Sequence, residues 1–131
     1  DHTRAVIKSV KAKRPNFEVY SGFDENFGHN LLSGGNGCIA GTSNFAPEIS
    51  AGFARAARND NLAEMAEYQQ KIDTLMSIYS IGYQFVPIVK KAMVLRGIVE
   101  SDRCAAPLLS ATPEETEKIR QLLESSGLEI V

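Results

Sequence analysis

The feature that most constrains the fold of this sequence is a pair of short runs typical of β-strands. A segment long enough for one helix joins them. The first run, Phe17 to Ser21, is β-branched and aromatic, and the second, Gly37 to Gly41, is a short apolar run behind a glycine cluster. Between them, Asp24 can cap a helix that continues to about Leu32. Strands joined by a helical crossover lie parallel in one sheet, because a parallel pair needs such a return path. The segment therefore predicts an α/β fold.

Helical patterns flank this segment on both sides. Before it, residues 3–14 place apolar side chains at helical spacing until Pro15 ends the pattern. After Pro47, which suits the first turn of a helix, the period stays helical to the end of the chain. The apolar rows of these later helices predict core positions, among them Phe53, Leu62, Leu75, Met76 and Tyr79. We expect at least three helices beyond Pro47.

Two later helices carry start and stop signals. Pro87 can open one of them, and Gly97 is well placed to end it. The other has Thr112 as N-cap, Pro113 at the first helical position and Glu115 three residues after the cap, which is the capping-box pattern. No internal repeat, linker or low-complexity tract separates the parts of the sequence, so we expect one continuous domain.

Composition excludes several classes of protein. The 131 residues are 44% hydrophobic and 23% charged, as in an ordinary globular domain. The net charge of −2 provides no basic field for nucleic acid, and no apolar run is long enough to span a membrane. Cys38 and Cys104 lack metal-ligand spacing, so we interpret them as free, buried thiols in a reducing cytoplasm.

The common catalytic and cofactor motifs do not fit this chain. The glycine cluster precedes its strand, whereas a dinucleotide fingerprint follows one, and no phosphate-binding lysine comes after it. His2 and His29 have no acidic or cysteine partner at ligand spacing, and no serine stands in a nucleophile elbow. We therefore expect neither a metal nor a cofactor.

Polar residues that follow the two strands form the candidate binding site. In a parallel α/β array, the ligand lies beyond the C-terminal ends of the strands. Glycines there let a ligand approach the backbone, and neighbouring polar side chains offer partners for hydroxyl groups. The residues concerned are Gly22, Asp24, Glu25, Gly41, Thr42 and Ser43.

A purely structural interpretation of these residues stays open. Asp24 can cap the helix that follows it, and Thr42, Ser43 and Asn44 can form a turn. The pattern alone does not separate this interpretation from a ligand site.

Four ordered stretches resemble a known family over the whole chain. They read "YSGFDENF", "LLSGGNGCIAGTSNFAP", "FVPIVKKAMVLRGI" and "RCAAPLLSATPEE". They are similar to the C-terminal half of the dihydrodipicolinate synthase and N-acetylneuraminate lyase family, whose members are pyruvate-handling class I aldolases. The resemblance implies a (β/α)8 barrel with a C-terminal helical extension. It makes the two runs barrel strands seven and eight, with residues 1–58 as the last β/α units and 59–131 as the helical region.

The resemblance also assigns roles to residues at the two strand ends. Gly22, Asp24 and Glu25 match the segment that holds the hydroxylated part of a sugar acid. Ile39 and Gly41 match the backbone that lines the pyruvate end, with Thr42 beside them. Sialate lyases carry serine where Gly41 stands here. The resemblance therefore implies pyruvate with an aldehyde, or a shorter 2-keto-3-deoxy sugar acid, as the small-molecule partners, in a cytoplasmic homotetramer.

The lysine that forms the Schiff base in this family lies on strand six, and its proton-shuttling tyrosine on strand five. Both would precede Asp1, and the seven lysines of this chain all fall in helical patterns. The sequence also begins without methionine, so we expect a fragment with no catalytic residue of its own. Two interpretations stay open: an aldolase whose other half supplies the lysine, or an inactive half-barrel piece that only oligomerises.

Overall fold

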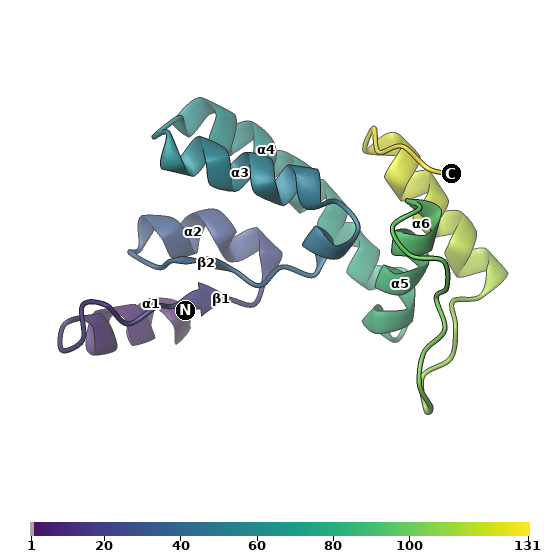
Figure 1. Ribbon diagram of the computed structural model, residues 1–131, viewed down its shortest axis with the longest axis horizontal. Helices are drawn as coiled ribbons and strands as arrows, with labels where there is room; N and C mark the ends of the chain where they lie inside the picture. Colours follow the sequence, from purple (N-terminus) through teal and green to yellow (C-terminus); the bar gives the residue numbers. More distant parts are fainter. Residues whose placement is uncertain (1) are drawn as a thin grey trace.

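The chain folds into a small α/β part followed by a helical part, in a computed structural model that describes residues 2–131 (Figure 1). The η1 element is a π-helical turn, and the other η elements are 3₁₀ helices. In chain order the elements are α1 (His2–Val6), η1 (Ile7–Lys11), β1 (Tyr20–Ser21), η2 (Asp24–Asn26), α2 (Phe27–Leu32), β2 (Gly37–Cys38), η3 (Thr42–Asn44), α3 (Pro47–Arg58), α4 (Leu62–Leu75), η4 (Met76–Ser80), α5 (Phe85–Leu95) and α6 (Pro113–Ser125).

The two strands pair in parallel, as predicted. Tyr20 lies opposite Gly37, and Ser21 lies opposite Cys38. The return path between them runs through η2 and α2, and α2 lies beside the pair (Figure 1). The helix-strand-helix-strand order of the sequence therefore gives the parallel unit expected from the need for a crossover.

The strands are much shorter than the predicted runs of five residues, and asparagine side chains add hydrogen bonds to the backbone around them. The Val19 amide donates to Oδ1 of Asn36 at 3.0 Å. Asn30, which is 1% exposed, donates through Nδ2 to the carbonyls of Val19 at 3.1 Å and Gly37 at 2.6 Å. Two asparagines thus complete the hydrogen bonding around a two-residue ladder.

The predicted helix signals are present at the observed ends. Pro47 opens α3, and Thr112 and Glu115 form a capping box at α6, with hydrogen bonds of 2.7 and 3.1 Å. Gly97 follows α5 with φ +68°, which ends the helix. Pro87 does not open α5, which begins two residues earlier at Phe85. Proline is accommodated there because N–H groups of the first turn have no partner within the helix.

The core lies between α3, α4, η4, α5 and α6. Helices α3 and α4 run side by side, and α5 and α6 pack at the other end of the molecule (Figure 1). Leu62, predicted as core, is 68% exposed at the start of α4. The fully buried members of the core include Phe45, Phe53, Ile72, Leu75, Ile78, Ile119 and Leu123.

Membrane insertion has no support among the described helices. From residue 2 to residue 131, none is both long and apolar enough to cross a bilayer.

Candidate functional site

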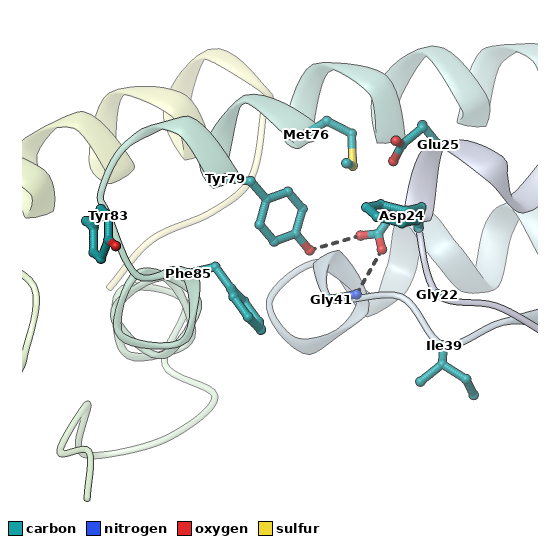
Figure 2. Close-up of a pocket in the computed structure, with 10 residues that line it drawn as sticks. Gly22, Asp24, Glu25, Ile39, Gly41, Met76, Tyr79, Tyr83 and Phe85 are labelled. Carbon is teal, nitrogen blue, oxygen red and sulfur yellow. Dashed lines mark hydrogen bonds between the residues drawn. The ribbon is translucent and has the colours of Figure 1, made fainter. Parts of the chain in front are cut away.

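A pocket of about 580 Å³ opens at the C-terminal ends of the two strands. Five of the seven predicted site residues line it, and Thr42 and Ser43 do not. Side chains from η4 and from the start of α5 form the remainder of the wall (Figure 2). The lining residues are Gly22, Phe23, Asp24, Glu25, Ile39, Gly41, Met76, Tyr79, Tyr83 and Phe85.

Asp24 ties three segments of the chain together at this pocket. Its Oδ1 accepts a hydrogen bond from the amide of Gly41 at 3.0 Å, and its Oδ2 accepts one from the amide of Thr42 at 2.7 Å. The hydroxyl of Tyr79 donates to the same Oδ2 at 3.3 Å (Figure 2). A carboxylate has about four acceptor positions, so three of them are filled within the chain. The carboxylate is 2% exposed.

The expected capping of the next helix by Asp24 is wrong. Neither η2 nor α2 has a side-chain hydrogen bond at its N-cap. The carboxylate instead binds the first amides of η3, the turn that follows the second strand. Those amides have no partner inside so short a turn, and a negative charge stabilises them.

The η3 turn confirms the structural interpretation of Thr42, Ser43 and Asn44. Ser43 Oγ donates to the carbonyl of Ala40 at 2.6 Å, and Asn44 Nδ2 donates to that of Gly41 at 2.9 Å. Thr42 is 1% exposed, and its hydroxyl has no hydrogen-bond partner among residues 2–131. These side chains shape the turn and do not line the pocket.

Glu25 presents the free carboxylate of the pocket. It is an exposed residue, and its backbone carbonyl accepts from Nε2 of Gln69 at 3.2 Å. Within the described part of the chain, its carboxylate oxygens have no hydrogen-bond partner. The two neighbouring acids therefore differ: Asp24 is occupied by the protein, and Glu25 is available to hydroxyl groups of a ligand.

An aromatic wall was missed by the sequence analysis. Tyr79 and Met76 were assigned to a core stripe, yet both line the pocket. The ring of Phe85 packs edge-on against that of Tyr79, with centroids 6.1 Å apart. Helical periodicity identifies an apolar face but does not tell whether that face meets a core or a pocket. The sequence pattern does not mark the change, because Met76 and Tyr79 continue the apolar row of α4, whereas the structure places them beyond its end, in η4.

The environment of Tyr79 keeps its phenol protonated. Burial raises the pKa of Tyr79 above its usual value of 10.0, and the neighbouring charge of Asp24 raises it further. A raised phenol pKa stabilises the fold at any pH below 10, and this contribution is lost as the pH rises above 10 toward the pKa of the folded state.

We expect Tyr79→Phe to remove a phenol titration that lies above pH 10. In a titration followed at the phenolate absorbance, the difference between wild type and Tyr79→Phe should rise only above pH 10. Tyr83→Phe, which alters an exposed ring of the same wall, is the matched variant. A Tyr79 signal that appears below pH 10 would contradict the buried hydrogen bond to Asp24.

No lysine lines the pocket among the described residues. Several lysines make contacts elsewhere in the chain. Lys11 donates to the carbonyl of Gly34, Lys90 donates to the carbonyl of Arg103, and Lys91 pairs with Asp102 at 2.5 Å. Lys118 pairs with Glu114 at 2.7 Å on the surface of α6.

The two cysteines are free, but neither is fully buried as predicted. Cys38 lies on β2 with Sγ at 3.6 Å from the carbonyl of Phe23, and Cys104 lies in the connection before α6. Partial burial raises the pKa of the Cys38 thiol. Across residues 2–131, no group of three or more His, Cys, Asp or Glu side chains is arranged to hold a metal ion.

Comparison with known proteins places this arrangement in a family. The Dihydrodipicolinate synthetase family matches residues 1–126. A protein of Escherichia coli K12 named "Probable 2-dehydro-3-deoxy-D-pentonate aldolase YjhH" is 37% identical over 127 residues, which is 97% of this chain and 42% of that protein. The chain belongs to the dihydrodipicolinate synthetase family, and it matches the C-terminal part of its relatives.

Solved structures agree with this assignment. YagE, a prophage protein of this family from Escherichia coli K12 solved in complex with pyruvate, superimposes with a TM-score of 0.92 and 31% identity, over 97% of this chain and 43% of YagE. A monomeric dihydrodipicolinate synthase variant gives a TM-score of 0.85 and 29% identity, over 96% of this chain and 41% of that structure. The chain thus spans about two fifths of the length of these relatives.

Proposed function

We propose that this chain is the C-terminal part of a lyase that cleaves a 2-keto-3-deoxy sugar acid into pyruvate and an aldehyde. The observation that carries the proposal is the pocket where both strands end, which brings Gly22, Asp24, Glu25, Ile39 and Gly41 together. Family membership, the aldolase name of YjhH and the pyruvate bound to YagE support it.

The pocket divides into two ends in this proposal. Ile39 and the backbone at Gly41 lie at the pyruvate end, beside the strand. Glu25, with its free carboxylate, accepts hydrogen bonds from the hydroxyl groups of the sugar chain. Asp24 keeps one acceptor position for the same chain, while the amides of Gly41 and Thr42 and the hydroxyl of Tyr79 fill the other three. Thr42 contributes through its backbone amide, which fixes Asp24 at 2.7 Å.

The nucleophile belongs to another segment of the protein in this proposal. A Schiff-base lysine needs a desolvated pocket that lowers its pKa, and the lysines of this chain lie on helix surfaces or in ion pairs. We place the lysine upstream of this chain, and we assign β1 and β2 to barrel strands seven and eight. The 58/59 boundary, the homotetramer and the cytoplasmic location remain predictions.

The proposed lysine cleaves the sugar acid through an imine. An imine between the lysine and the 2-keto group withdraws electrons from the bond between C3 and C4 of the substrate. Cleavage of that bond releases the aldehyde as the C4 hydroxyl loses a proton, and the bonding electrons stay on C3 as an enamine. The enamine takes up a proton at C3, and hydrolysis of the resulting imine releases pyruvate and the free lysine. The residues described here bind and orient the sugar acid.

Borohydride trapping tests the proposal. The protein that contains this chain, treated with pyruvate and borohydride, should gain one stoichiometric adduct on a peptide upstream of residue 1. The 131-residue chain alone should gain none. An adduct on any of its seven lysines would contradict the placement of the nucleophile.

The same samples address the alternative of an inactive piece. A full-length protein that forms no adduct and cleaves no 2-keto-3-deoxy acid, while the 131-residue chain forms oligomers, would favour the structural role. The exposure of Phe23, Leu32 and Ile39, at 66%, 76% and 72%, gives such association an apolar surface.

A further inference from the structure

Position 41 needs glycine because a side chain has no room there, and not because of the backbone conformation. Gly41 has φ −68° and ψ −36°, which are ordinary helical values open to any residue. A Cβ built on it, however, would overlap the hydroxyl oxygen of Tyr79 and would stand 3.2 Å from Cζ of the same ring. A side chain at position 41 and the phenol of Tyr79 would therefore occupy the same space.

The same two residues also share a hydrogen-bond partner. The Gly41 amide and the Tyr79 hydroxyl bind the two oxygens of Asp24, at 3.0 and 3.3 Å (Figure 2). The ring of Phe85 packs edge-on with that of Tyr79, with centroids 6.1 Å apart. A shift of Tyr79 that made room for a Cβ at position 41 would also move its hydroxyl relative to Oδ2 of Asp24.

We propose that Tyr79 is a specificity-determining residue of this site: its hydroxyl fills the space that a side chain at position 41 would take, and it leaves Asp24 only one free acceptor position. The inference rests on the proposed function. It goes further by naming the group that limits the room for the sugar chain beside Asp24.

The consequence for the substrate is a preference for a short sugar chain. With Tyr79 in place, Glu25 and one position of Asp24 are the carboxylate acceptors of the pocket. The Tyr79 oxygen donates its proton to Asp24 and retains lone pairs for one substrate hydroxyl. Removal of the phenol oxygen would exchange that acceptor for a second acceptor position of Asp24 and would return its space to the pocket. A substrate with one more hydroxylated carbon would then gain room beside Asp24.

The first arm of the test measures specificity in the full-length protein. The probes are 2-dehydro-3-deoxy-D-pentonate and its six-carbon homologue 2-dehydro-3-deoxy-D-gluconate, the sugar acids in the names of YjhH and YagE. Tyr79→Phe should shift the ratio of kcat/KM about tenfold toward the six-carbon acid, mainly through KM. A role of Tyr79 in folding alone would lower stability and leave this ratio unchanged.

The second arm measures the packing by a double-mutant cycle. Gly41→Ala should lower Tm by at least about 4 °C, because the new methyl group meets the phenol oxygen. In the double variant Gly41→Ala with Tyr79→Phe, the oxygen is absent and at least half of this loss should return. Gly22→Ala is the stability control, since a Cβ there meets nothing within 4 Å.

The outcomes separate the two proposals. Two results overturn only the assignment of Tyr79. One is an active wild type whose substrate preference is unchanged by Tyr79→Phe, and the other is a double variant no more stable than Gly41→Ala. A wild type that cleaves neither acid and forms no pyruvate adduct overturns the proposed function and this assignment together. A shifted ratio with recovered Tm supports the assignment.

Discussion

Asp24→Ala should destabilise the protein by about 2–4 kcal/mol and abolish the organised pocket. The substitution leaves the amides of Gly41 and Thr42 without their acceptor, in a place where Asp24 is 2% exposed. A buried donor that loses its partner costs about 1–3 kcal/mol, and two donors are involved here. Urea unfolding of the full-length protein measures the loss.

Two further variants make this result specific. Asp24→Asn keeps one acceptor oxygen but turns an NH2 group toward the other amide, so about half of the destabilisation should remain. Glu25→Ala is the matched control, because this neighbouring acid is exposed and its carboxylate has no partner in the described chain. It should leave stability within about 0.5 kcal/mol of wild type while it raises KM for the sugar acid. Equal destabilisation by Asp24→Ala and Glu25→Ala would refute the division of roles between the two acids.

Leu75→Ala should cost about 2–5 kcal/mol, the usual penalty for a cavity at a fully buried leucine. Leu75 closes α4 with 0% exposure, and it packs in the core shared by α3, η4 and α5. Thermal or urea unfolding of the full-length protein is the measurement.

The same helix supplies the control. Leu62 opens α4 with 68% of its surface exposed, so Leu62→Ala should change stability by less than about 0.5 kcal/mol. The pair separates burial from helix propensity, because both substitutions replace leucine by alanine in one helix. A loss at position 62 as large as that at position 75 would mean that another surface covers Leu62.

Local signals in the sequence predicted the parts of the fold that depend on neighbouring residues. Thr112 with Glu115 gave the capping box, and the helical crossover gave the parallel pair. The asparagine bonds around the strands were not predictable in this way, because Asn30 and Asn36 reach backbone groups of Val19 that lie 11 and 17 positions away. The prediction that Leu62 lies in the core was wrong for a related reason. Periodicity identifies the apolar face of a helix, but burial of that face depends on what packs against it.

The residues of the candidate site that follow the strands could be predicted from the sequence. Those that come from the helical region could not. Asp24, Glu25 and Gly41 stand directly after strand-like runs, so their convergence follows from parallel topology. Tyr79 and Phe85 reach the pocket only because η4 and the start of α5 pack beside it. The requirement for glycine at 41 was also hidden, since it arises from a ring 38 positions away and not from the local turn.

The hydrogen bond between Tyr79 and Asp24 joins residues 55 positions apart. This separation determines which parts of the pocket form first during folding. Closing so long a loop costs chain entropy before the contact stabilises anything, so contacts of this kind form late compared with helices. During synthesis, the strand pair and the η3 turn leave the ribosome well before Tyr79. The pocket is therefore unfinished until the helical region docks, and a nascent chain that stops short of η4 carries the strand ends without the wall that includes Met76 and Tyr79.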